Sequence, residues 1–257
     1  MDILTHKENG VLSISFNRPE KKNAITASMY QAMADALKDG EADAAIRAIL
    51  ISGRPEIFTA GNDLEDFMKN APSTAQGGTP PVYQFMQALS QSSKPVVAAV
   101  SGAAVGIGTT LLMHCDLVYL ADNAKLSMPF TRLGLCPEFA SSMLFPQIVG
   151  YPRAAEKLML GEAFSAQDAW DMGLATKVLP LEELLPYAQK QAAKLAALPA
   201  NSIRTTKRLM KGNQAAAIVA KMEEENKNFG EMLKAPEAKE AFTAFFEKRK
   251  PDFSKFS

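Results

Sequence analysis

The sequence predicts an α/β protein built of ββα-like turns, and two observations lead to this fold class. Up to about residue 140, short apolar runs typical of buried parallel strands alternate with segments of helical periodicity. Beyond that point helical patterns dominate, and only residues 175–179 resemble a strand. A chain of 257 residues, 47% of them hydrophobic, is long enough to bury a large core.

Local signals define the elements of the first half. Residues 11–16 alternate apolar and small polar side chains, as a half-buried strand does, and end at the turn signal Asn17-Arg18-Pro19. Thr26 then serves as the N-cap of a helix with an apolar face. The residues of that face are Met29, Met33, Ala36 and Leu37. The elements expected to follow are strands at 46–52, 96–100 and 117–120 and helices at 81–90 and 106–113.

The second half is expected to be helical. Ser165-Ala166-Gln167-Asp168 is a capping-box signal at the start of one helix, and Gly173 suits the end of that helix. Further helices are expected at 181–198, 200–211, 214–233 and 236–249. We therefore divide the chain into a core at 1–199 and a C-terminal helical region at 200–257.

The last helices carry more apolar surface than a two-helix tail can bury alone. This surface either forms a subunit interface or packs onto the core of its own chain. The residues concerned are Met222, Phe229, Met232, Leu233, Phe242, Phe245 and Phe246.

Composition and charge exclude several function classes. Lys+Arg and Asp+Glu number 28 each, so nothing indicates a nucleic acid or other polyanionic partner. Cys115 and Cys136 lie among apolar residues and are interpreted as packing residues of a reduced protein. With only His6 and His114 present, a Ser-His-Asp relay or a histidine metal site has almost no material, and no metal is expected.

No segment reads as a targeting or membrane signal. Residues 1–7 lack a basic region followed by an apolar core, and residues 253–257 are not a peroxisomal address. Glycines interrupt the apolar stretch 95–121, which we interpret as strand, turn, helix and strand. We therefore expect a cytoplasmic protein without a membrane partner. The polar loop at 70–81 is interpreted either as a mobile lid or as a solvated linker.

Two small-residue loops lead from a strand end to a helix start and so present backbone N–H groups. In the first, 58–67, Ala60 and Gly61 allow a ligand to approach the backbone closely. The second, 101–110, ends at a helix start with free N–H donors and a partial positive charge. Its glycine spacing is not that of a dinucleotide or phosphate loop, and the chain has no Gly-x-Ser-x-Gly elbow.

A single carboxylate, Glu138, interrupts the otherwise apolar run 133–142. Burial raises the pKa of a carboxyl group toward the range in which it exchanges protons with carbon near neutral pH. Alternatively, Glu138 caps the helix suggested by residues 141–145, because a carboxylate near a helix N-terminus is favourable by itself.

The motifs at 58–64 and 102–116 and the start Asn17-Arg18-Pro19…Lys22-Asn23-Ala24 occur in a specific order and spacing. This combination resembles the enoyl-CoA hydratase/isomerase (crotonase) superfamily across nearly the whole chain. The resemblance implies a crotonase-type spiral of ββα turns, with acyl-CoA binding and catalysis in the core, followed by a helical trimerisation region. It further implies an acyl-CoA thioester substrate and a homotrimer or dimer of trimers. No separate cofactor is implied, since CoA is part of the substrate.

The resemblance also implies site residues. The N–H groups of Ala60 and Ile107 would form an oxyanion hole. For Lys22, contact with the CoA phosphates and a solvated surface position are both open. The residues implied to contact substrate or CoA are Lys22, Ala24, Ala60, Gly61, Asn62, Asp63, Leu64 and Gly106.

Hydratases of this family use two glutamates, and the matching positions here hold Thr110 and Phe130. The stretch 133–142 is instead similar to the peroxisomal-type Δ3,Δ2-enoyl-CoA isomerases, in which one glutamate, here Glu138, is the base. This implies isomerisation of 3-enoyl-CoA to 2-enoyl-CoA by a one-base 1,3-proton shift, in fatty-acid oxidation or related acyl-CoA breakdown.

The acyl pocket is expected to include Phe130, which would keep it dry, together with Met128 and Phe139, although core packing also suits these last two. Two other functions stay open. One is an enoyl-CoA hydratase or another crotonase reaction that uses Glu138; the other is a non-catalytic acyl-CoA-binding scaffold.

Overall fold

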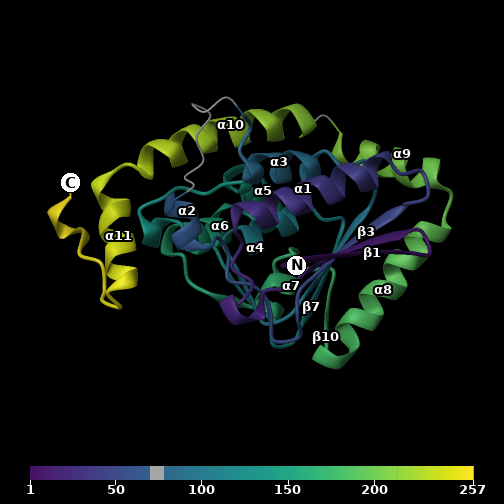
Figure 1. Ribbon diagram of the computed structural model, residues 1–257, viewed down its shortest axis with the longest axis horizontal. Helices are drawn as coiled ribbons and strands as arrows, with labels where there is room; N and C mark the ends of the chain where they lie inside the picture. Colours follow the sequence, from purple (N-terminus) through teal and green to yellow (C-terminus); the bar gives the residue numbers. More distant parts are fainter. Residues whose placement is uncertain (70–77, 213, 257) are drawn as a thin grey trace.

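Two sheets organise the computed structural model, which describes residues 1–69, 78–212 and 214–256 (Figure 1). The larger sheet has the strand order β1-β2-β3-β5-β7-β10, and the smaller has the order β4-β6-β8-β9. The strands are β1 (Ile3–Glu8), β2 (Val11–Phe16), β3 (Ala48–Ser52), β4 (Ile57–Thr59), β5 (Val96–Val100), β6 (Ala103–Val105), β7 (Leu117–Ala121), β8 (Lys125–Ser127), β9 (Phe164–Ser165) and β10 (Lys177–Leu179).

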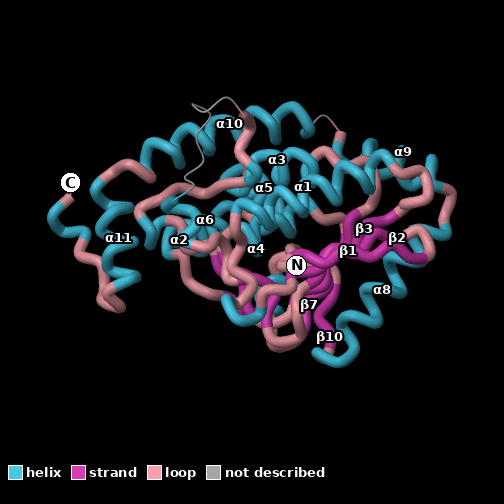
Figure 2. The backbone as a smooth tube through the Cα atoms, viewed as in Figure 1, coloured by secondary structure: helices cyan, strands magenta, loops and turns pink. Residues whose placement is uncertain are grey.

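Helices cover both faces of the larger sheet, as the α/β prediction requires. From β2 to β10 the strands of this sheet are parallel, and only β1 pairs antiparallel with β2. Strands β3 and β5 are buried along their whole length, which is why they read as continuous apolar runs. Helices α1 (Ala27–Ala42) and α3 (Pro81–Ser90) pack against each other on one side of the sheet, and α8 (Leu181–Ala197) contacts β3, β5 and β7 on the other (Figure 2).

The helices follow the predicted pattern closely where a cap or a proline marks the start. Thr26 accepts a hydrogen bond from the Met29 N–H at the start of α1, and Ser165 and Asp168 form the expected capping box of α7. The helices are α1 (Ala27–Ala42), α2 (Leu64–Lys69), α3 (Pro81–Ser90), α4 (Ile107–Thr110), α5 (Ser141–Val149), α6 (Tyr151–Leu160), α7 (Ala166–Asp171), α8 (Leu181–Ala197), α9 (Ala200–Lys211), α10 (Gln214–Met232) and α11 (Pro236–Phe246). The short 3₁₀ turns are η1 (Pro19–Lys21), η3 (Leu111–His114), η4 (Thr131–Leu133) and η5 (Phe253–Lys255).

The smaller sheet was not predicted as a unit, and it positions the two loops of interest. Its strands β4 and β6 are parallel neighbours, so their following loops emerge on the same side. Helix α4 approaches β4 closely because residue 108 is glycine: a Cβ there would lie 2.5 Å from the Thr59 Cγ2. Most of the 70–81 loop lies outside the described residues, so both interpretations of it stay predictions.

The C-terminal helices resolve the apolar surface into two groups. Met222, Phe229 and Phe242 are buried in the core of their own chain, and Met232 and Leu233 pack against it, as the second explanation held. Phe245 and Phe246, on α11 at the far end of the molecule from α8, are 58% and 45% exposed (Figure 1). The homotrimer and the boundary at residue 199 stay predictions. None of the helices described is long and apolar enough to cross a membrane.

Candidate active site

Glu138 lies in a tight turn that opens α5. It is 5% exposed, and its Oε1 atom has no hydrogen-bond partner among the described residues. The next two residues, Phe139 and Ala140, both have left-handed backbone conformations, with φ of 61° and 56°. We call residues 138–140 the Glu138 turn.

The helix-capping interpretation of Glu138 is wrong. Two N–H groups at the start of α5, those of Ala140 and Ser142, donate to the carboxylate of Glu225 on α10 at 2.5 and 2.9 Å. Since another acidic residue satisfies these donors, the Glu138 side chain is left to face the cavity.

The surroundings of Glu138 suit a base that works near neutral pH. Burial raises the pKa of its carboxyl group to about 8, and the negative charge of Glu225 contributes in the same direction. Phe130, at a position where a hydratase would carry a second glutamate, is itself 5% exposed and adds no charge.

A second segment, residues 59–63, contributes Ala60, Gly61, Asn62 and Asp63 to the lining of the cavity; we call it the 59–63 loop. The Ala60 N–H donates to the Lys22 carbonyl at 3.0 Å, so Ala60 is not a free oxyanion donor as the resemblance implied. Ile25 bonds to both neighbours of Asn62: it donates to the Gly61 carbonyl at 2.8 Å and accepts from the Asp63 N–H at 2.9 Å. Because of this pairing the Asn62 N–H points away from Ile25, and it has no partner among the described residues.

Gly61 brings the 59–63 loop against the second glycine turn. It has φ +86°, and a Cβ there would lie 2.8 Å from the Val105 carbonyl oxygen. Gly106 follows with φ 56°, and Ile107 is the first residue of α4, where an N–H has no partner within the helix. The N–H groups of Asn62 and Ile107 are therefore the available pair of donors, and the Ile107 expectation fits this geometry.

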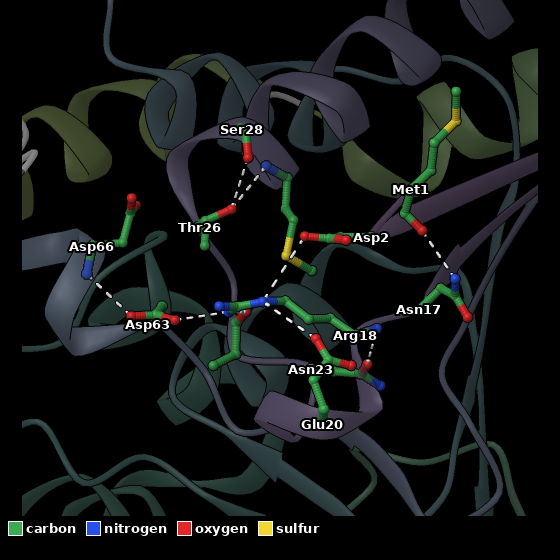
Figure 3. Close-up of polar contacts among 12 residues, drawn as sticks. Met1, Asp2, Asn17, Arg18, Glu20, Asn23, Thr26, Ser28, Asp63 and Asp66 are labelled. Atoms are coloured by element: carbon green, nitrogen blue, oxygen red, sulfur yellow. Dashed lines mark hydrogen bonds and ion pairs between the residues drawn. The ribbon is translucent and has the colours of Figure 1, made fainter.

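Buried polar contacts hold the 59–63 loop to residues 18–25. Asn23 is fully buried, and its side-chain amide donates to the carbonyls of Ile57 and Phe58 at 3.1 and 3.0 Å. Arg18 donates to the Ala24 carbonyl at 2.8 Å and to Asp63 at 2.7 Å (Figure 3). Sequence reasoning missed both roles, although both residues belong to the quoted start motif.

One cavity of about 570 Å³ joins these parts. Every residue implied to contact substrate or CoA lines it, together with Ile107, Phe130 and Glu138. Met128 and Phe139 do not line it; both are fully buried, and Phe139 stacks on His114 with 3.9 Å between ring centroids. The lining residues that sequence reasoning did not assign to the site include Lys21, Phe67, Arg132, Leu135, Phe229, Phe242, Phe245 and Phe246.

The cavity has an apolar interior and a charged rim. Lys22 is exposed at its edge, which leaves both interpretations of this lysine open. In the part of the chain that the structure describes, no three His, Cys, Asp or Glu residues gather as metal ligands. The lining of the cavity thus includes one buried carboxyl group and two residues, Asn62 and Ile107, whose N–H groups have no partner among the described residues.

This chain is similar to known proteins in both sequence and structure. A family model, Enoyl-CoA hydratase/isomerase, matches residues 6–255. Enoyl-CoA delta isomerase 2 of Rattus norvegicus is 38% identical over 226 residues, which cover 87% of this chain and 58% of the rat protein. A probable enoyl-CoA hydratase of Bacillus subtilis (strain 168) is 33% identical over 237 residues, 90% of each protein. The crystal structure of an enoyl-CoA hydratase/isomerase from Pseudoalteromonas atlantica T6c matches with a TM-score of 0.93 at 40% identity, covering 99% of this chain and 100% of that one.

Proposed function

Because this chain belongs to the enoyl-CoA hydratase/isomerase family, we propose that it isomerises 3-enoyl-CoA to 2-enoyl-CoA with Glu138 as its single base. The observation that carries the proposal is the Glu138 carboxyl group itself, which is buried, lines the cavity and has one oxygen without a partner in the described part of the chain. The two positions at which the resemblance places hydratase glutamates hold Thr110 and Phe130, which cannot act as carboxylate bases.

The proposed reaction is a proton transfer in two steps. The Glu138 carboxylate removes a proton from C2 of the 3-enoyl thioester, and the electron pair moves onto the thioester oxygen to give a dienolate. The N–H groups of Asn62 and Ile107 would stabilise that oxygen, because aimed backbone donors are strongest where charge develops in a water-poor site. Glu138 then returns the proton to C4, which leaves the double bond between C2 and C3. No water is consumed.

The proposal predicts that Glu138→Gln lowers kcat for the isomerisation of 3-hexenoyl-CoA about 10²–10⁴-fold, the usual range for a general base. Formation of the 2-enoyl product measures it. Glu182→Gln, an exposed substitution on α8, is the matched control and should behave as wild type. Since the base acts in its ionised form, kcat/KM of the wild type should rise with pH and level off above about 8. Undiminished turnover by Glu138→Gln would refute the assignment.

Hydration by the same carboxylate is the second candidate, because hydratases stand among the relatives. Incubation of 2-enoyl-CoA in H₂¹⁸O separates the two reactions: labelled 3-hydroxyacyl-CoA indicates hydration, and its absence alongside isomerisation supports the proposal. Failure to exchange the C2 proton of a bound acyl-CoA for deuterium would instead favour a scaffold without turnover.

A further inference from the structure

A second buried carboxylate supports the turn that carries Glu138. Glu225, on α10, is 5% exposed. It accepts hydrogen bonds from the Ala140 N–H at 2.5 Å, the Ser142 N–H at 2.9 Å and the Ser142 hydroxyl at 2.5 Å. A residue 87 positions beyond the base in sequence (225 against 138) thus fixes the backbone directly after it.

The Glu138 turn needs such support. Two consecutive residues with side chains in the left-handed region each carry a conformational cost, and they persist only where surrounding contacts hold them. On the opposite side, the His114 Nε2 atom lies 2.8 Å from the Phe139 carbonyl. Burial lowers the pKa of His114 to about 3, so the ring is neutral and its Nε2–H is the donor. The turn is therefore clamped by His114 from η3 and by Glu225 from α10.

The two carboxylates differ in how well each can carry charge. Both Glu225 oxygens accept hydrogen bonds, which favour its ionised form although burial raises its pKa. Glu138 has an oxygen without a partner among the residues that the structure describes, so its ionised form is less stabilised. Of two nearby acids, the proton is expected to stay on the poorly solvated one.

We propose that Glu225 is the positioning residue of the catalytic carboxylate: it clamps the Phe139–Ala140 backbone that directs Glu138 to the cavity and places a buried negative charge beside it. This inference rests on the proposed role of Glu138 as the base. It gives α10, outside the predicted core, a part in the reaction without any contact with the reacting atoms.

The other groups around this pair do not replace that charge. Tyr30 from α1 and Tyr83 from α3 both have raised pKa values, chiefly through burial and then through the charge of Glu138. Burial likewise raises the pKa of the Cys136 thiol to about 11. Lys221, one turn before Glu225 on α10, is the cation whose charge acts on Glu225, but it forms an ion pair with Glu224 at 2.5 Å.

The test titrates the carboxyl group directly, without substrate. Infrared absorption of protonated carboxyl groups is followed against pH in the wild type, Glu138→Gln, Glu225→Gln and the neighbouring control Glu224→Gln. The band that Glu138→Gln removes reports Glu138. We expect its midpoint to fall by about one pH unit or more in Glu225→Gln and to stay unchanged in Glu224→Gln. The same midpoint in Glu225→Gln and wild type would overturn the electrostatic part of the proposal.

A charge-conserving variant tests the clamp separately, and it also serves if Glu225→Gln does not fold. Glu225→Asp keeps the charge but shortens the reach, so kcat should fall about 10-fold or more while KM and the Glu138 midpoint stay near wild type. Glu224→Asp is the control. Wild-type kcat in Glu225→Asp would overturn the positioning role. Because the infrared titration needs no turnover, a shifted midpoint in a protein without isomerase activity would refute the proposed function and leave the Glu225 effect standing.

Discussion

The 59–63 loop and the Glu138 turn reach the same cavity, and they differ in how completely their polar groups are paired. In the loop, the N–H groups of Ala60, Gly61 and Asp63 all donate to neighbouring oxygens, whereas that of Asn62 has no partner among the described residues. In the turn, the backbone is held by His114 and Glu225, but the Glu138 side chain has an oxygen without a partner among the described residues.

Under the proposed function, this difference matches what each part would do in the reaction. A donor that stabilises a developing negative charge works best when its neighbours fix it rigidly, because no reorganisation is then needed during the reaction. A base must hold its proton loosely enough to release it near neutral pH and tightly enough to take it from carbon. Burial, and then the negative charge of Glu225, raise the pKa of Glu138 into that range.

After Glu138→Gln, the largest effect is expected from disturbing the rigid side of this comparison. Gly61→Ala places a Cβ 2.8 Å from the Val105 carbonyl oxygen at φ +86°, so the loop must shift and the Asn62 N–H moves with it. Loss of one oxyanion donor lowers kcat about 10²–10³-fold, and we expect this range for 3-hexenoyl-CoA. Gly78→Ala is the control, since a Cβ added at that position would meet nothing within 4 Å. Equal kcat values for both variants would show that the loop does not position a donor.

For the Glu138 turn, we predict that Glu138→Gln is more stable than wild type and that the gain depends on pH. The folded protein raises the pKa of Glu138 from its ordinary value of about 4.5 to about 8, so folding favours the protonated form. Wild-type stability therefore falls as pH rises between these values, since the native state binds more protons than the unfolded state. Glu138→Gln does not lose this stability, because a glutamine side chain does not titrate in this range. Its free energy of unfolding should exceed that of wild type by roughly 5 kcal/mol well above pH 8 and by little below pH 4.5.

Urea unfolding of both proteins across this pH range measures the difference. Glu182→Gln, which removes an exposed carboxylate from α8, should track wild type at every pH. A difference in the free energy of unfolding between Glu138→Gln and wild type that stays constant with pH would mean that folding does not raise the pKa of Glu138.

The sequence predicts elements well where local chemistry decides them and poorly where partners are distant. The bounds of α3 and α9 match their prediction, and α1 begins where the Thr26 cap places it. Strands β4, β6, β8 and β9 are two or three residues long, too short to show any periodicity. Strand β1 buries only Ile3, so it also lacks an apolar pattern.

The site follows the same division. Glu138 stands out because its sequence neighbours are apolar. The choice between Ala60 and Asn62 as donor depends on the Lys22 carbonyl, which lies far from the loop in sequence and takes the Ala60 N–H. Glu225 is one of three consecutive glutamates on a polar helix, and only the fold distinguishes it from its neighbours by burying it against Ser142.

The smallest expected effect comes from the ion pair that holds the 59–63 loop to Arg18. Arg18 and Asp63 are 15% and 13% exposed in their side chains, and their ion pair measures 2.7 Å. Burial raises the pKa of Asp63, but hydrogen bonds from Arg18 and the Asp66 N–H outweigh it, so the net pKa is lowered.

Arg18→Gln should therefore destabilise the protein by about 1–3 kcal/mol at neutral pH. The pair's contribution is present above the ordinary aspartate pKa of about 3.9 and is lost as pH falls below the lowered value, so the gap to wild type should narrow in acid. Urea unfolding at neutral pH and in acid measures the difference in the free energy of unfolding between Arg18→Gln and wild type. Arg153→Gln, an exposed substitution, is the control. A gap that does not change with pH would mean that Arg18 acts through its bond to the Ala24 carbonyl and not through Asp63.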